Sequence, residues 1–501
     1  MHFILALAAF VTGVPQTSSS DSESPAPVHV QESELRKSVV NLTVTQERCL
    51  PTSPWKRESP DKIGGSGVVI APGRILTNAH VVAEASEILM ETSQTPLAVT
   101  AEVVAIDPSR DLALLKTDDP EFIAAHPSVP LFQGLPKDGS RVTVMGFPMG
   151  GDAMSTTSGV VSRAEWAEIG EFGEAGMRIQ VDAAVNHGNS GGPAFGEGQI
   201  VGLAFSGMDQ AEADNIAYLI ATEEIQRFLD EADRGVVRGN AVSDERVQTM
   251  ENQALRAKVG VAPVVNGVLV TSDASGAFQP WDVITKVNGY EVNNRGQVTI
   301  EGDRMVAYDC AIGRFVPGES ASGFTAEIIR AGKPMTISVP ALRHHGGVIG
   351  NPVDGNYSYL LYGPLAFTPL TGDLAAAVNG WMLREPGPAL DGLFDRRSSG
   401  GKELIAVASP LLTHPTARGY EVLPGQTVRT VNGTEVKNFA EFVALLRDLK
   451  DEFVVFEFNE RACERIVFRR AEVEPASERL MESNGIRRQC SKDVQAIWDK
   501  Q

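Results

Sequence analysis

Many short runs of β-type residues, each ended by a turn, fill the stretch from Val39 to Thr222 and restrict this chain more than any other feature. Similar runs recur at Val68–Ile70, Ile75–Thr77, Val142–Met145, Val160–Ser162, Ile179–Val181, Ile200–Phe205 and Ile216–Ile220. Short strands at this spacing are typical of a β-sandwich or a β-barrel. The pattern therefore predicts a mostly β domain. We expect it to close with a helix that Thr222 caps and that carries Ile225, Phe228 and Leu229 on its apolar face.

Two smaller regions with mixed patterning follow this domain, at 245–342 and 356–475. Each contains an alternating apolar run that ends in Asn-Gly, at Asn288-Gly289 and at Asn432-Gly433. Asn-Gly after such a run is a strong hairpin signal. In the third region, Asn438 and Glu441 resemble a capping box, followed by a helical face that starts at Phe439. We interpret the two regions as a weak repeat of one small α+β unit.

The ends of the chain differ in composition from these regions. An apolar run from Phe3 to Val14 is too short to span a bilayer as a helix but has the length of a signal-peptide core. We expect a signal peptide at 1–20 and a periplasmic or secreted protein; an uncleaved apolar terminus is the alternative. Residues 21–38 read as a disordered leader, and residues 476–501 as a polar tail. The first domain would then span 39–232, and the charged stretch Asp230–Gly239 would be a linker.

Charge and cysteine usage exclude several classes of function. A formal net charge of −20 argues against nucleic acid and against anionic membranes as partners. The four cysteines form no C-x-x-C pair, and no phosphate-binding P-loop is visible, so we predict neither a metal nor another cofactor. Cys463 and Cys490 could pair in an oxidising compartment, or all four could be unpaired thiols.

Three short motifs in the first domain carry chemistry: Leu76-Thr-Asn-Ala-His80, Ser109-Arg-Asp111-Leu, and Asn186-His-Gly188-Asn-Ser190-Gly-Gly-Pro. A serine hydroxyl needs an imidazole to take its proton, and the imidazole needs a carboxylate on its other nitrogen. Glycines beside the serine let backbone N–H groups face the developing oxyanion. We therefore predict His80, Asp111 and Ser190 as catalytic residues, with an oxyanion hole formed by the N–H groups of Gly188 and Ser190.

Some residues of these motifs also fit other arrangements. Gly188 to Gly192 also fits the G-x-S-x-G elbow of α/β-hydrolases, but those enzymes place the acid and the histidine after the serine. Here both precede it, in the order His, Asp, Ser. Asp107 is a competing acid, but it precedes a proline in a turn. We read Asp182 as structural, and we expect His187 to face solvent.

The motifs TNAHVV, DLALLK, GFPMGG, TSGVVSR, QVDAAVNHGNSGGPAF and IVGLAFSG follow one another as they do in the HtrA/Deg serine proteases of the trypsin-like clan. DVITKVNG and VRTVNG are similar to PDZ domains, and GYEVLPGQTVRTVNGTEVKNFAEF resembles the second PDZ domain of the plant Deg subgroup. The resemblance implies a chymotrypsin-like double β-barrel followed by two small α+β PDZ-like domains.

The same resemblance implies further properties. Ala184 would form the bottom of the main specificity pocket, so cleavage would follow small or medium aliphatic residues. Ala204, Phe205 and Ser206 would form an edge strand that pairs with the substrate backbone. The loop Glu165–Met177 corresponds to a sensor loop in that family, and Tyr362-Gly363-Pro364-Leu365 resembles a cradle for a peptide C-terminus.

The implied activity is ATP-independent cleavage of misfolded or unfolded proteins by a homo-oligomer of trimers or multiples of trimers. Asn189 replaces the acid that activates trypsin-like zymogens, so loop ordering is the more plausible switch. A peptide-binding chaperone that keeps a protease shell and a site-specific signalling protease are the alternatives.

Overall fold

The computed structural model describes residues 32–92, 98–148, 153–168, 175–205, 216–243, 245–273, 275–314, 323–343, 356–378, 403–422, 424–459 and 465–500. The predicted signal peptide and residues 21–31 of the predicted leader lie outside these ranges, as do Cys463 and Ser206. Residues 32–37 of the predicted leader form helix α1 (Glu32–Lys37), so the prediction of disorder was wrong there. Acidic residues in its first turn, basic residues in its last and the buried Leu35 stabilise this helix.

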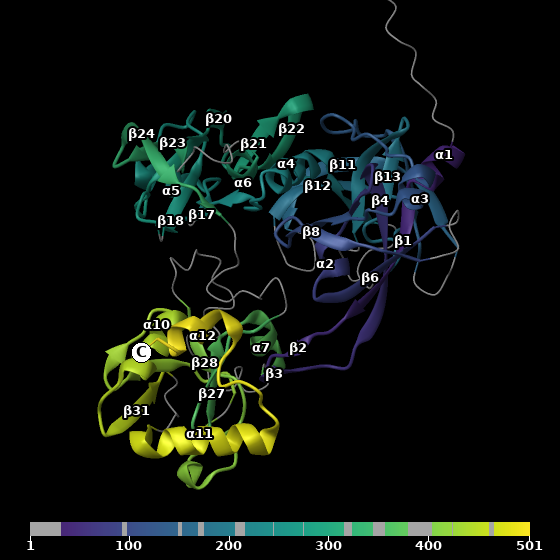
Figure 1. Cartoon of the computed structure of the whole chain (residues 1–501). Helices are drawn as coiled ribbons and strands as arrows, with labels where there is room; N and C mark the ends of the chain where they lie inside the picture. Colours follow the sequence, from purple (N-terminus) through teal and green to yellow (C-terminus); the bar gives the residue numbers. More distant parts are fainter. Residues whose placement is uncertain are drawn as a thin grey trace, which may run out of the picture.

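Two large antiparallel β-sheets, drawn in purple and blue in Figure 1, make up most of the described part of the first domain, as the short β-type runs predicted. The strand order of the first sheet is β7-β6-β1-β4-β5-β9-β8, and the second closes into a barrel in the order β10-β11-β12-β15-β14-β13. The strands of the first sheet are β1 (Val39–Gln46), β4 (Asp61–Ala71), β5 (Arg74–Thr77), β6 (Ala85–Glu91), β7 (Val99–Thr100), β8 (Glu102–Asp107) and β9 (Leu112–Lys116). The strands of the barrel are β10 (Arg141–Gly146), β11 (Ser155–Glu168), β12 (Ala175–Val181), β13 (Pro193–Gly196), β14 (Gln199–Phe205) and β15 (Ala217–Ala221).

Besides α1, the described residues of this domain form the helices α2 (Ala79–Val82), α3 (Pro120–Ala125) and α4 (Thr222–Asp233). Helix α4 is the predicted closing helix, and Ile225 and Phe228 are fully buried on its apolar face. Thr222 is not its N-cap, because the cap position is Ala221 and the Thr222 hydroxyl donates to the Gly134 carbonyl instead. The helix also includes residues 230–233, which the sequence had suggested as linker.

The second domain is built on the sheet β17-β18-β19-β23-β24, with β20 paired to β19. Its apolar core is continuous with that of the barrel: Trp166 on β11 belongs to the same buried cluster as Val306 and Ile312 of the second domain. The elements are β16 (Ala241–Val242), β17 (Glu245–Thr249), α5 (Gln253–Val259), β18 (Val268–Asp273), β19 (Val283–Val287), β20 (Tyr290–Glu291), β21 (Gln297–Ile300), η1 (Glu301–Asp303), β22 (Arg304–Ala307), α6 (Asp309–Gly313), β23 (Gly323–Arg330), β24 (Lys333–Pro340) and β25 (Leu342–Arg343).

The third domain, green to yellow in Figure 1, combines the sheets β26-β27-β28 and β30-β29-β31-β32. Its elements are β26 (Leu360–Tyr362), β27 (Leu365–Pro369), α7 (Gly372–Ala377), β28 (Ile405–Val407), η2 (Pro415–Ala417), β29 (Val428–Val431), β30 (Thr434–Glu435), α10 (Phe439–Asp448), β31 (Phe453–Phe458), β32 (Ile466–Arg469), α11 (Arg470–Asn484) and α12 (Lys492–Trp498). As expected, Asn438 caps α10 through the N–H of Glu441. Both Asn-Gly turns have positive φ at each residue, as a type I′ hairpin requires.

The predicted boundary at 475/476 was wrong. Helix α11 runs through it, and Leu480, Cys490 and Val494 are buried in the third domain. The backbone of Cys490 also forms an isolated antiparallel β-bridge with that of Leu360. The apolar side chains of this C-terminal segment complete the core, so the segment is part of the domain and not a tail.

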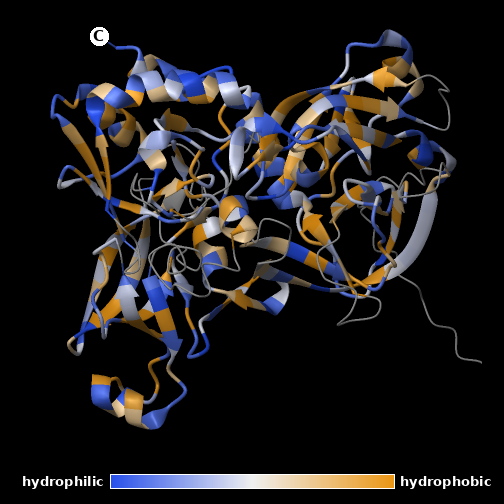
Figure 2. Ribbon diagram, turned by 90° about the horizontal axis from the view of Figure 1, so that it is seen from below, coloured by the Kyte–Doolittle hydropathy of each residue, from blue (hydrophilic) through white to orange (hydrophobic). Residues whose placement is uncertain are grey.

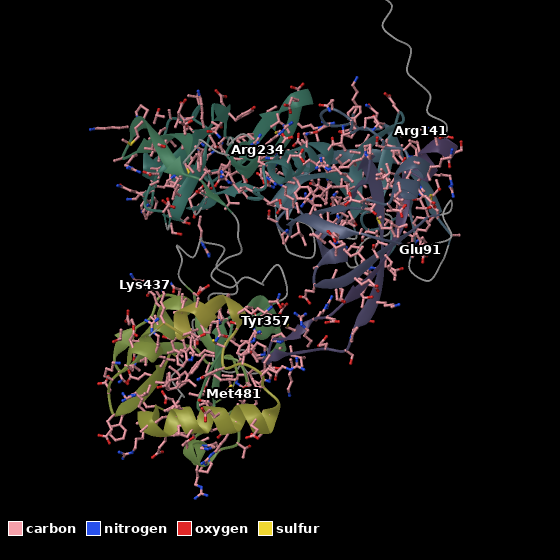
Figure 3. All side chains as sticks on the ribbon, viewed as in Figure 1. Glu91, Arg141, Arg234, Tyr357, Lys437 and Met481 are labelled. Atoms are coloured by element: carbon pink, nitrogen blue, oxygen red, sulfur yellow. The ribbon has the colours of Figure 1, made fainter. Side chains whose placement is uncertain are left out.

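The hairpin of β2 (Cys49–Leu50) and β3 (Ser53–Arg57) extends from the first sheet to the third domain (Figure 1). There Trp55 packs edge-on against Tyr359, with ring centroids 6.0 Å apart. Figure 3 marks this junction by Tyr357, whose hydroxyl donates to Asp373 on α7. Figure 2 shows hydrophobic and hydrophilic residues alternating along several strands, as expected for sheets with one face buried. Within the described ranges, no helix is both long and apolar enough to cross a membrane.

Candidate active site

His80 and Asp111 meet at the edge of the first sheet. His80 lies on the single turn of α2, directly after β5, and Asp111 lies directly before β9, the neighbour of β5. The Asp111 carboxylate contacts His80 Nδ1 with oxygen–nitrogen distances of 2.8 and 3.0 Å. It also accepts the backbone N–H of His80 at 3.0 Å. This geometry leaves Nδ1 as the protonated nitrogen and directs Nε2 away from the carboxylate.

The backbone of Asp111 has φ +58°, a left-handed conformation that is uncommon for residues other than glycine. Two contacts hold it: the Asn78 side-chain amide donates to the Asp111 carbonyl at 2.9 Å, and the Asp111 N–H donates to Pro108. Asp107, the competing acid, does not face His80. Its carboxylate accepts from the hydroxyl and the N–H of Ser109 and from Arg110, and it therefore organises the turn that ends at Asp111.

The loop that carries Ser190 packs against the same strands. The Ser190 carbonyl accepts the N–H of Ser66 on β4 at 2.8 Å. Gly191 has φ +81°, and a side chain there would overlap the Ser66 carbonyl and the Thr77 hydroxyl. Thr77 lies three residues before His80, so this close approach seats the serine loop beside the turn that carries the imidazole. Within the described residues, the Ser190 hydroxyl makes no hydrogen bond.

The predicted oxyanion donors are available. Gly188 has φ +94°, and its carbonyl accepts a 2.7 Å hydrogen bond from the Ser66 hydroxyl. In the part of the chain that the structure describes, neither the Gly188 N–H nor the Ser190 N–H donates to a protein acceptor. Two such N–H groups on one loop can stabilise a negative oxygen.

The remaining predicted residues lie around this loop. Ala184 is exposed, and its carbonyl accepts the Thr157 hydroxyl at 2.8 Å. His187 is exposed, as predicted. Asp182 accepts the N–H of Val160, which agrees with a structural role. Of the predicted sensor loop, residues 169–174 lie outside the described ranges.

One prediction for the substrate strand was wrong. Strand β14 is not an edge at Ala204, because the Ala204 N–H donates to Gly192 and its carbonyl accepts from Gly191. Ala204 is thus a support of the serine loop. Phe205 is buried, with the Arg178 guanidinium 5.3 Å from its ring centroid, and Ser206 lies outside the described residues.

The predicted peptide cradle of the third domain is covered by the chain itself. The Gly363 N–H donates to the hydroxyl of Ser477 on α11 at 2.9 Å, and Tyr362 and Leu365 are buried. A peptide carboxylate at this loop would have to displace α11.

Two supporting residues, Ser66 and Arg110, are not predicted by any sequence pattern. Ser66 stands inside an ordinary β-type run and Arg110 inside an ordinary turn. Ser66 binds Gly188 and Arg110 binds Glu231, and in both pairs the partner lies more than 100 positions away in the sequence.

The chain is similar to proteins of known family over most of its length. Residues 65–203 match the family model described as a trypsin-like peptidase domain, and residues 350–493 match a PDZ domain. Protease Do-like 2, chloroplastic, from Arabidopsis thaliana is 32% identical over 88% of this chain and 73% of its own length. Protease Do-like 4, mitochondrial, from the same plant is 30% identical over 83% of this chain and 80% of its own length. A solved structure of the HtrA-type protease AlgW with a tripeptide is 23% identical, has a TM-score of 0.49, and covers 62% of this chain and 95% of its own.

Proposed function

Because the chain belongs to the HtrA/Deg family of Do-like serine proteases and is a serine endopeptidase, we propose that His80, Asp111 and Ser190 are its catalytic residues. The observation that supports this most is the Asp111 carboxylate, which holds both the Nδ1 and the backbone N–H of His80. A carboxylate in this position selects the tautomer in which Nε2 can accept a proton.

In the proposed mechanism, Ser190 Oγ attacks the scissile carbonyl while His80 Nε2 takes its proton. Asp111 stabilises the resulting imidazolium. The N–H groups of Gly188 and Ser190 bind the oxyanion of the tetrahedral intermediate. His80 then gives its proton to the leaving amine, and a water molecule that His80 activates releases the acyl group from Ser190. Loss of one oxyanion donor typically lowers kcat by about 10²–10³-fold.

The proposed specificity rests on Ala184, six residues before Ser190. A Lys or Arg side chain would find no carboxylate at this position, and burial of an unpaired charge is unfavourable. We therefore expect cleavage after Val, Ala and similar residues. Peptides that differ only in Val, Ala or Arg at the cleavage position test this, and a preference for Arg would refute it.

The proposed substrates are misfolded or unfolded proteins, because the sequence encodes no nucleotide-driven unfolding motif and the enzyme would need segments that are already extended. We propose that it works as a trimer or a multiple of trimers, which light scattering would test.

Relatives carry names that place them in the chloroplast, the mitochondrion and the periplasm. For this chain we propose the periplasm or secretion, which cell fractionation would test.

Labelling with a fluorophosphonate probe tests the nucleophile, because such probes react with activated serines. We expect the label on Ser190, and we expect Ser190→Ala to lose both the label and the cleavage of unfolded casein. If wild type and Ser190→Ala were equally inert under conditions in which both are folded, the proposed mechanism would fail.

A further inference from the structure

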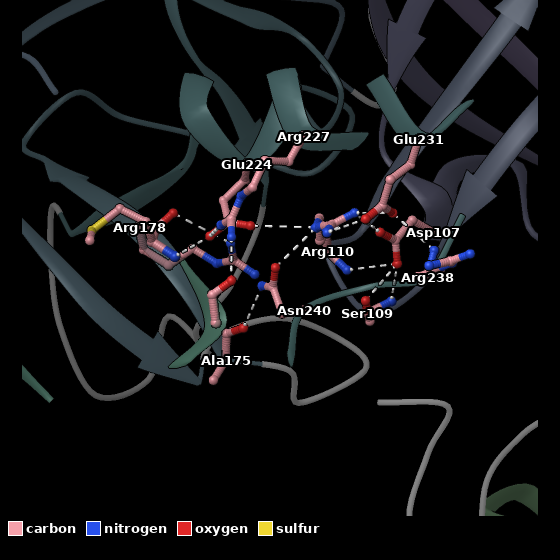
Figure 4. Close-up of polar contacts among 12 residues, drawn as sticks. Asp107, Ser109, Arg110, Ala175, Arg178, Glu224, Arg227, Glu231, Arg238 and Asn240 are labelled. Atoms are coloured by element: carbon pink, nitrogen blue, oxygen red, sulfur yellow. Dashed lines mark hydrogen bonds and ion pairs between the residues drawn. The ribbon is translucent and has the colours of Figure 1, made fainter. Parts of the chain in front are cut away.

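A cluster of charged side chains, most of them buried, surrounds the residue that precedes the proposed catalytic acid in the sequence (Figure 4). Its centre is Arg110, the residue before Asp111, whose side chain is 1% exposed. We call it the Arg110 cluster, and its other charged members are Asp107, Arg178, Glu224, Arg227 and Glu231.

The Arg110 guanidinium donates hydrogen bonds to side chains from three segments of the chain. Nη1 donates to Asp107 Oδ2 at 2.8 Å and to Glu231 Oε2 at 2.9 Å, and Nη2 donates to Glu231 Oε1 at 3.3 Å. Nε donates to the side chain of Asn240 at 3.1 Å and lies 3.6 Å from Glu224 Oε2. A planar fork of N–H donors fits this arrangement, which a lysine could not reproduce.

Asp107 is the contact that matters for the active site. Its carboxylate accepts the N–H groups of Ser109 and Arg110, and so it shapes the turn from which Asp111 emerges with φ +58°. Arg110 fixes that carboxylate from the other side. The position of Asp111 therefore depends on a side chain that does not itself touch His80.

Two glutamates of the cluster, Glu224 and Glu231, hold Arg110 in place. Glu231 and Glu224 lie on α4, and Glu231 also accepts the N–H of Arg238 in the segment that leads to the second domain. Burial alone would raise the pKa of Glu224, yet that pKa is lowered, because Arg227, Arg110 and Arg178 surround the carboxylate. The Glu224 carboxylate is thus charged, and it lies 3.6 Å from Arg110 Nε.

We propose that Arg110 is a positioning residue for the proposed reaction: its guanidinium holds Asp107 and the turn 107–111 in the conformation that presents Asp111 to His80. This role rests on the catalytic function proposed above.

Arg178 provides a matched control. It is as deeply buried as Arg110 and faces Glu224, but it comes from β12 and lies in Figure 4 at the opposite end of the cluster from Asp107. Replacement of either arginine by lysine keeps the charge and removes the planar fork.

The test compares Arg110→Lys with Arg178→Lys in the full chain, by thermal unfolding and by the pH dependence of kcat/KM. We expect both variants to lower Tm. We expect Arg110→Lys to lower kcat at least about 10-fold with KM within about 2-fold. We also expect it to move the acid limb of the profile to lower pH, because a misplaced Asp111 stabilises the His80 imidazolium less well. Arg178→Lys should leave that limb in place.

Glu231→Gln keeps Arg110 but weakens the ion pair that holds it. This variant should move the acid limb of the pH profile to lower pH by a smaller amount than Arg110→Lys. It serves as the test variant if Arg110→Lys does not fold. An unchanged limb in a folded Arg110 or Glu231 variant would overturn the proposal, as would an equal shift in Arg178→Lys. An inert wild type, unlabelled at Ser190, would instead refute the proposed function.

Discussion

The hydroxyl of Ser66 donates a 2.7 Å hydrogen bond to the carbonyl oxygen of Gly188. The same hydroxyl accepts the N–H of Phe147, and the Ser66 N–H donates to the Ser190 carbonyl. One buried residue of β4 therefore holds the serine loop on both sides of Asn189. This arrangement orients the peptide groups whose N–H bonds form the proposed oxyanion hole.

Ser66→Ala should lower kcat by about 10–100-fold with little change in KM, because it leaves the buried Gly188 carbonyl without its donor, a loss of about 1–3 kcal/mol. Steady-state kinetics on a peptide substrate measure this. Ser38→Ala is the matched control: the buried Ser38 hydroxyl also donates to a carbonyl, that of Pro127, which is not part of the serine loop. A similar loss of kcat in both variants would argue against a local role of Ser66.

Gly191→Ala should abolish activity, because the new Cβ would overlap the backbone carbonyl of Ser66 and the Thr77 hydroxyl. Gly139→Ala is the control that introduces the backbone strain of a positive φ without the steric overlap. Gly139 has the same φ of +81°, with open space around its Cβ position, so that variant should lose about 1–2 kcal/mol of stability and stay active. Casein cleavage and thermal unfolding measure the two effects, and an active Gly191→Ala enzyme would contradict the packing described here.

Asp111→Asn should lower kcat by about 10⁴-fold, the size of effect seen for the corresponding change in trypsin-like enzymes, while the protein stays folded. The amide cannot select the required tautomer of His80, whereas asparagine tolerates the positive φ at this position. Asp107→Asn should lower Tm, unlike Asp111→Asn, because Asp107 forms an ion pair with the buried Arg110. Full activity in Asp111→Asn would remove this residue from the mechanism.

The stability of the second domain should fall between about pH 4.5 and pH 7 because of Glu245. Burial raises the pKa of this carboxyl to about 7, although Ser243 and Tyr308 donate to it. The folded state therefore binds the proton more tightly than the unfolded state, whose carboxyl titrates near 4.5. The stabilisation is complete at low pH and is lost as the pH rises, by up to about 2–3 kcal/mol for this incompletely buried side chain.

Thermal unfolding of wild type and Glu245→Gln at pH 5 and pH 8 tests this effect. The variant should show a smaller difference between the two pH values than wild type. Glu327→Gln, at a carboxylate that is exposed and pairs with Lys286, should keep the wild-type difference. Identical pH profiles for wild type and Glu245→Gln would exclude Glu245 as the source.

Trp55→Ala should loosen the third domain from the hairpin β2–β3. Trp55 packs in a cluster with Tyr359 and Leu361, and its truncation should remove about 2–3 kcal/mol of contact energy for a partly buried aromatic side chain. Small-angle scattering should show a larger radius of gyration. Arg57→Ala, which removes two exposed hydrogen bonds, to Asn356 and to the Glu47 carbonyl, should leave the radius of gyration unchanged. An unchanged radius in Trp55→Ala would contradict the inferred contact.

Features that depend on neighbouring residues followed from the sequence. The alternating strands, the Asn-Gly hairpins and the start of α10 at Asn438 each reflect a local backbone preference. The family resemblance and the ordered His, Asp and Ser motifs also needed no coordinates, because their chemistry requires those residue types beside tight turns.

Other features were decided by the packing of distant segments. Ser66 hydrogen-bonds to a loop 122 positions away, and Arg110 binds Glu231 121 positions away. The backbone of Ala204 hydrogen-bonds to the serine loop and not, as predicted, to substrate. The C-terminal segment completes the core of the third domain and covers Gly363, although its sequence resembles a polar tail. Hydrogen bonds and burial of this kind depend on which surfaces meet when the chain folds, and the local sequence does not record that.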